Sequence, residues 1–133
     1  DTPELTLDQE NTLSLLASKG DQGRSLVNVQ DLLEASLRLR PDRIMLGELR
    51  GKEAYAFMRA VNTGHPGSIT SVHADTPRGA FEQITLMVMQ AGLNINRAEI
   101  LEYLHNIIDI VVQLKRVNGE RRITDIYFPK GAA

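Results

Sequence analysis

Hydrophobic residues in this chain occur in two patterns, short apolar runs and helical stripes. The short runs predict strands, and residues 44–46 are apolar at every position, as in a strand that is buried on both faces. The other predicted strands lie at residues 12–17, 68–72 and 107–114. Elsewhere, apolar side chains recur every three or four positions, which predicts helices. These stripes cover residues 28–40, 52–62 and 76–91, and a fourth begins at residue 96.

Polar residues at the helix ends support these boundaries. Asn28 and Asn96 are favourable N-cap residues, and Asn96 forms a capping-box pattern with Glu99 three positions later. Thr76 followed by Pro77 combines an N-cap hydroxyl with proline at the first helical position. We therefore expect helices to start at these three places.

The last part of the chain predicts a β-hairpin. Asn118 and Gly119 separate the strand at 107–114 from an alternating segment at 122–128, and Asn-Gly is a strong signal for a two-residue turn. Strands and helices that alternate with short connections favour an α/β fold with a mostly parallel sheet flanked by helices. The predicted fold is therefore α/β, with an antiparallel hairpin at its C-terminal end.

Composition excludes several classes of protein. The longest uninterrupted apolar run, Ala54 to Met58, is five residues long, whereas a membrane-spanning helix needs roughly 18. The 133 residues contain no cysteine, so thiolate metal sites and cysteine nucleophiles are excluded. Fifteen basic and seventeen acidic residues give a net charge of −2, and aromatic residues do not interleave with basic ones. The chain therefore carries no direct signal for binding nucleic acid.

Polar residues that could perform chemistry follow the strand at 44–46. In open α/β sheets, ligands bind beyond the carboxyl ends of the strands. Glu48 lies at this position, where a carboxylate can orient a water molecule and accept its proton. Gly47 beside it would allow a ligand to approach the backbone closely. The alternative is a strand end whose charged residues only face solvent.

A second polar cluster follows the strand at 68–72. His73 could donate to an oxyanion when neutral, or sense a phosphate when charged. A structural histidine bonded to a backbone carbonyl is the alternative. His65, His73 and Asp75 also allow a metal-dependent hydrolase as a distant hypothesis. The sequence contains no G-x-x-x-x-G-K-[ST] motif, so no phosphate-binding P-loop lies within these residues.

Three segments together resemble the motifs of the ATPases of type II and type IV secretion systems. Residues 40–51 resemble the Walker B segment of that family, and residues 63–76 resemble its histidine box. Residues 1–5 resemble the end of its aspartate box. The three segments occur in the order that the family has, so the resemblance covers essentially the whole chain.

The resemblance implies a RecA-like domain that hydrolyses ATP with Mg²⁺. Glu48 matches the glutamate that activates the attacking water, and Mg²⁺ would lie near Glu48 and Glu4 with water between them. His73 matches the residue thought to sense the γ-phosphate. The resemblance assigns catalysis to Glu48 and Glu4, and nucleotide or γ-phosphate sensing to His73, Arg50, Asp1 and Glu53. We expect Arg50 and Glu53 to form pairs that fix the loop after Glu48.

The family most similar to this chain is that of the traffic ATPases of type IV secretion. The resemblance implies a hexameric ring at the cytoplasmic face of the bacterial inner membrane, peripheral to the membrane, with inner-membrane and channel components as partners. Residues 1–133 would be the C-terminal part of the motor domain, with the P-loop and an N-terminal domain upstream. We expect this fragment alone to be inactive.

Two other functions remain open from the sequence. A pilus extension or retraction ATPase belongs to the same class, although Gly51 stands where we expect an acidic residue in pilus motors. A non-catalytic structural or assembly module of a secretion machine is favoured by the missing P-loop. It is disfavoured by Glu48 and His73, because a scaffold needs neither residue.

Overall fold

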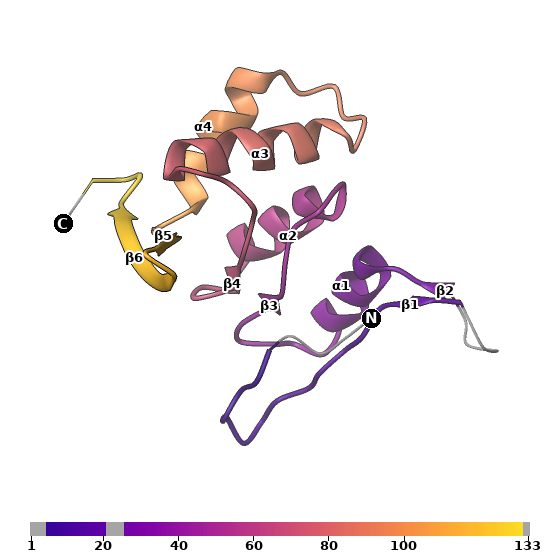
Figure 1. Ribbon diagram of the computed structural model, residues 1–133. Helices are drawn as coiled ribbons and strands as arrows, with labels where there is room; N and C mark the ends of the chain where they lie inside the picture. The colour runs from indigo at the N-terminus through magenta and orange to yellow at the C-terminus, as the bar shows by residue number, and fades with distance from the viewer. Residues whose placement is uncertain (1–4, 21–25, 132–133) are drawn as a thin grey trace.

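The computed structural model describes residues 5–20 and 26–131 (Figure 1). Its helices are α1 (Val29–Leu37), α2 (Glu53–Asn62), α3 (Pro77–Met89) and α4 (Arg97–Ile107). Its strands are β1 (Ser18–Lys19), β2 (Leu26–Val27), β3 (Met45–Leu46), β4 (Ile69–Thr70), β5 (Val111–Val117) and β6 (Glu120–Tyr127). The predicted α/β class and the C-terminal hairpin are confirmed.

The parallel sheet is smaller than the strand pattern predicts. β3 and β4 pair in parallel, with Met45 opposite Ile69 and Leu46 opposite Thr70. Among the described residues, the other two pairs, β1 with β2 and β5 with β6, are antiparallel. Helix α2 connects β3 to β4, because a parallel connection must return the chain to the same end of the sheet.

The strand predicted at residues 12–17 is wrong. This segment has no regular structure, and Leu13, Leu15 and Leu16 are exposed. Ladder pairing begins only at Ser18, where β1 pairs with β2. An apolar run forms a strand only where its backbone joins a ladder with a second segment, and here the ladder starts at Ser18.

The helix boundaries agree closely with the polar capping pattern. Asn28 and Asn96 both form complete capping boxes, and the Thr76 hydroxyl accepts a hydrogen bond from the Gly79 backbone at 3.0 Å. Helix α4 runs further than predicted and includes Ile107, which was assigned to the following strand. Ile107 is buried because it continues the apolar face of α4, and β5 therefore starts four residues later.

The hairpin turn has the geometry that its two residues favour. Asn118 and Gly119 both have positive φ angles, 51° and 83°. This combination is typical of the type I′ turn, whose twist matches that of paired antiparallel strands. The strands β5 and β6 pair from Val111 to Val117, with one register shift between Gln113 and Leu114.

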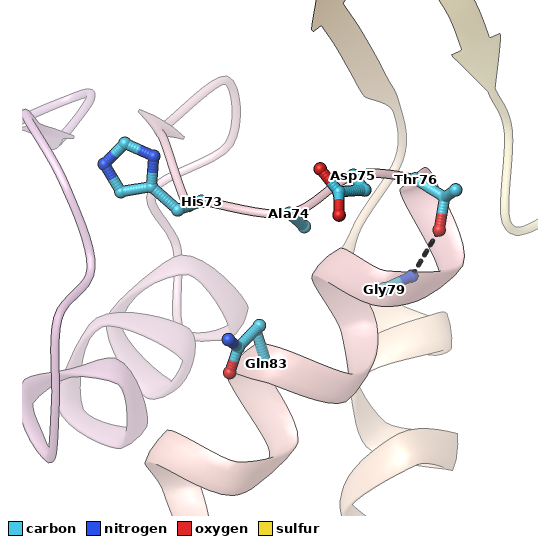
Figure 2. Close-up of a pocket in the computed structure, with 6 residues that line it drawn as sticks. All are labelled: His73, Ala74, Asp75, Thr76, Gly79 and Gln83. Carbon is cyan, nitrogen blue, oxygen red and sulfur yellow. Dashed lines mark hydrogen bonds between the residues drawn. The ribbon is translucent and has the colours of Figure 1, made fainter.

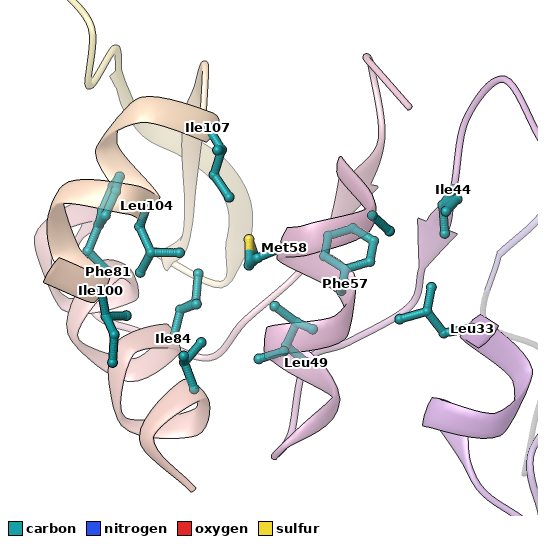
Figure 3. Packing of buried hydrophobic residues seen from close by; sticks show 13 residues of the cluster. Leu33, Ile44, Leu49, Phe57, Met58, Phe81, Ile84, Ile100, Leu104 and Ile107 are labelled. Atoms are coloured by element: carbon teal, nitrogen blue, oxygen red, sulfur yellow. The ribbon is translucent and has the colours of Figure 1, made fainter. Parts of the chain in front are cut away.

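Helix α2 lies at the centre of the hydrophobic core (Figure 3). On one side it packs against α1, and on the other against α3 and α4. Its buried residues Phe57 and Met58 contact the same cluster as Leu49, which follows β3, and Leu104 of α4. The core therefore fixes the positions of the segments on either side of α2.

We expect Leu104→Ala to destabilise the protein by about 2–5 kcal/mol, because Leu104 is fully buried and its removal leaves a cavity. The matched control is Leu86→Ala on α3, where the side chain is 54% exposed and the loss should be much smaller. Urea unfolding of the full-length protein gives both free energies. Equal losses for the two variants would contradict the described core.

Candidate functional site

Hydrogen bonds beyond β3 and β4 bring the two polar clusters together. The Leu49 backbone N–H donates to the Ser71 carbonyl at 2.9 Å, and the Ser71 hydroxyl donates to the Gly47 carbonyl at 2.7 Å. At the other end of the pair, the Ser68 hydroxyl accepts from the Ile44 backbone at 3.0 Å. The loops after the two strands therefore lie side by side at the carboxyl edge of the sheet.

Glu48 is held by two cationic or potentially cationic side chains. Its Oε1 lies 2.8 Å from Nε2 of His73, and its Oε2 accepts from Nε of Arg50 at 2.6 Å. The Glu48 side chain is 15% exposed, whereas His73 is 94% exposed and Arg50 67% exposed. The structure thus combines a largely buried carboxylate with an imidazole that solvent, or a ligand, can reach.

Glu53 fixes the loop between Glu48 and α2. Its Oε1 accepts the backbone N–H groups of Arg50 at 2.6 Å and of Gly51 at 2.8 Å. Lys52, the N-cap of α2, makes no capping bond with its side chain, and the bonds of Glu53 go to the two residues that precede it. A carboxylate at this position also interacts favourably with the positive end of the helix dipole.

A pocket of about 480 Å³ opens between His73 and the start of α3 (Figure 2). Its lining consists of His73, Ala74, Asp75, Thr76, Gly79 and Gln83. The start of a helix suits an anion, because its first backbone N–H groups have no partner within the helix. Sequence reasoning missed Gly79 and Gln83, although their four-residue spacing places both on one face of α3.

His65, the other histidine of the metal-site hypothesis, makes a structural contact instead. Nδ1 of His65 donates to the Pro41 carbonyl at 2.7 Å, and the Ser68 hydroxyl donates to the His65 carbonyl at 2.7 Å. Within residues 5–20 and 26–131, no group of three or more metal-ligating side chains is arranged around a common point. The hypothesis of a metal-dependent hydrolase built on His65, His73 and Asp75 therefore has no geometric support.

The two acids of the aspartate-box segment, Asp1 and Glu4, lie outside the described residues. The structure consequently brings together Glu48, Arg50 and His73, with Glu53 on the adjoining loop. No helix in the described part of the chain is long and apolar enough to span a bilayer.

The sequence and the α/β fold match an established family. Residues 1–128 match the family model described as "Type II/IV secretion system protein", so the chain belongs to this family. The type IV secretion system protein VirB11 of Bartonella quintana is 49% identical over 130 residues, which cover 96% of this chain and 36% of that protein. PtlH of Bordetella pertussis, another type IV secretion system protein, is 38% identical and covers 98% of the chain.

A solved structure agrees with the sequence comparison. The VirB11 ATPase of the Brucella suis type IV secretion system, crystallised with sulphate, superimposes with a TM-score of 0.72 at 38% identity. The match covers 77% of this chain and 32% of that structure. The chain thus spans about a third of the length of the VirB11 proteins of Bartonella and Brucella that it matches.

Replacement of Glu53 by alanine should release the loop after Glu48. We expect the amide hydrogens of Arg50 and Gly51 to exchange about five to ten times faster, because each N–H loses its carboxylate acceptor. Hydrogen exchange followed by mass spectrometry measures this, with Glu102→Ala on the exposed face of α4 as control. Unchanged exchange in the Glu53 variant would show that the Glu53 carboxylate does not hold the loop.

Proposed function

We propose that this chain forms the C-terminal part of a RecA-like ATPase domain, in a motor subunit of a type IV secretion system. The observation that carries the proposal is the contact of Glu48 with His73 and Arg50 at the carboxyl edge of β3 and β4. The names of the relatives support the secretion function, and that of the Brucella structure supports ATPase activity.

In this mechanism, Glu48 is the general base for hydrolysis. The oxygen of a water molecule bonds to the γ-phosphorus as the bond to the bridging oxygen of ADP breaks, and Glu48 accepts the proton of that water. His73 leaves Oε1 of Glu48 for a γ-phosphate oxygen when ATP binds, which frees Oε1 for the water. Loss of phosphate then returns His73 to Glu48. His73 thereby reports the state of the nucleotide.

Magnesium fits this site through water. Both Glu48 oxygens already have protein partners, and Mg²⁺ keeps several of its waters in nucleotide sites. When bound, Mg²⁺ neutralises charge that develops on the phosphates. Glu48, together with Glu4 of the aspartate-box segment, would contact these waters. Asp1, Arg50 and Glu53 complete the proposed nucleotide-sensing set.

The α- and β-phosphates need donors from elsewhere in the protein, because these 133 residues contain no G-x-x-x-x-G-K-[ST] motif. We therefore expect this chain alone to be inactive, and the full-length protein to hydrolyse ATP. The proposed assembly is a hexameric ring at the cytoplasmic face of the inner membrane. There it would contact inner-membrane and channel components, and power substrate transport or pilus biogenesis.

A structural or assembly module without catalysis is the alternative from a different class of protein. A pilus extension or retraction motor would share the chemistry of the preferred proposal. A structural module would hydrolyse no ATP, which distinguishes it from the preferred proposal. A pilus motor would be distinguished by deletion of its gene, which would disable pilus extension or retraction rather than type IV secretion.

Glu48→Gln in the full-length protein should lower kcat for ATP hydrolysis by at least about 100-fold, because an amide cannot accept the proton of water. The dissociation constant for ATP should change less than threefold. The rate of phosphate release in the presence of Mg²⁺ gives kcat. Titration with a fluorescent ATP analogue gives the dissociation constant. Glu102→Gln on α4 is the matched control.

Hydrolysis near the wild-type rate in Glu48→Gln would contradict the assignment of the base. A folded full-length wild type that hydrolyses no ATP would overturn the motor proposal and favour the structural module.

His73→Ala should weaken communication between subunits more than nucleotide binding. The Hill coefficient for ATP hydrolysis should fall toward 1, while the dissociation constant for ATP changes about threefold or less, because the sensor between γ-phosphate and Glu48 is lost. Steady-state kinetics across a range of ATP concentrations gives the coefficient. A cooperative wild type with the same coefficient in His73→Ala would contradict the sensing function.

A further inference from the structure

Gln113 is a buried polar residue on the inward face of β5. The residue is 9% exposed, whereas its neighbours Val112 and Leu114 are 44% and 63% exposed. The side-chain Nε2 donates to the Ala74 carbonyl at 3.0 Å and contacts the Leu114 carbonyl at 3.4 Å. A buried amide is costly unless it is paired, so the bond to Ala74 justifies a polar residue at this position.

The ladder between β5 and β6 is irregular at Gln113. Gln113 pairs with Asp125 and Leu114 pairs with Ile123, so Thr124 of β6 is an extra residue opposite this step of β5. Such a bulge disrupts the ladder locally, and bulges are frequent beside functional sites. Here the shift accompanies a side chain that leaves the hairpin and bonds to the loop between β4 and α3.

Besides the bonds at Ser71, two further contacts hold the loop that carries His73. Glu48 bonds to the His73 ring itself, and Gln113 bonds to the carbonyl of the next residue, Ala74. The first contact is exposed on the histidine side, and the second is largely buried. When His73 leaves Glu48, the bond from Gln113 remains to hold the backbone of the loop.

We propose that Gln113 is a positioning residue for His73, and that it connects the β5–β6 hairpin to the γ-phosphate sensor. The expected effect on ATP turnover rests on the proposed ATPase function. A movement of the hairpin would pass through the Gln113 amide to Ala74, and from there to the adjacent imidazole. Gln113 itself touches neither nucleotide nor water in this scheme.

The kinetic test uses the full-length protein with Gln113→Met, which keeps the length of the side chain and removes the donor. We expect kcat to fall about tenfold with KM within twofold, because a misplaced sensor slows turnover rather than binding. In a His73→Ala background the same change should cause no further loss, since Gln113 acts through His73. Asn106→Met on the exposed face of α4 is the matched control.

Gln113→Glu is a second variant, for use if Gln113→Met does not fold. An ionised carboxylate has a similar size but cannot donate a hydrogen bond to the Ala74 carbonyl. Either folded variant should show the same loss of kcat. Wild-type kcat in a folded variant, or a full additional loss in the His73→Ala background, would overturn the positioning function.

A structural measurement separates this inference from the ATPase proposal. In protein labelled with ¹³C-methyl alanine, the methyl order parameter of Ala74 should fall in the Gln113 variants, while that of buried Ala80 on α3 stays unchanged. A wild type without ATPase activity would contradict the proposed function, and the Ala74 signal would still test the contact. An unchanged Ala74 order parameter would refute the inference.

Discussion

The parallel pairing of β3 with β4 is the constraint on which the site depends. Its short ladder is extended by the bonds that join Leu49 and Gly47 to Ser71. The ladder and the bond from Leu49 join backbone groups, and the Ser71 hydroxyl adds a side-chain bond, so together they place the two following loops side by side. Glu48 and His73 meet because of this backbone geometry, since their own contact is largely solvent-exposed on the histidine side.

Helix α2 links the stability of the core to the geometry of the site. It connects the two strands, so its packing against the other helices sets how the strands approach each other. Glu53, its first residue, bonds to the loop that begins at Glu48. A substitution that shifts α2 would therefore disturb the carboxylate as well as the core, and both effects should appear together.

Local chemistry made much of the fold predictable from sequence. The caps at Asn28 and Asn96 and the turn at Asn118 depend on residues within three positions, so they formed as expected. Long-range pairing could not be predicted in the same way. The ladder begins at Ser18 rather than within the strand predicted at 12–17, and the bond from Gln113 to Ala74 joins residues 39 positions apart. The motifs suggested Glu48 and His73, but only the fold shows their contact.

In the site, the position of the Glu48 carboxylate is fixed, whereas its contact with His73 can be exchanged for another partner. Glu48 lies on a loop restrained by backbone bonds and by Glu53, whereas the imidazole of its partner His73 is 94% exposed and regains water when it leaves the carboxylate. In the proposed mechanism, a γ-phosphate can thus replace Glu48 as the partner of His73 at little cost, while the carboxylate stays in place. A deeply buried ion pair would resist that exchange, because separating its charges costs several kcal/mol. The exposure of His73 is therefore what the proposed sensing requires.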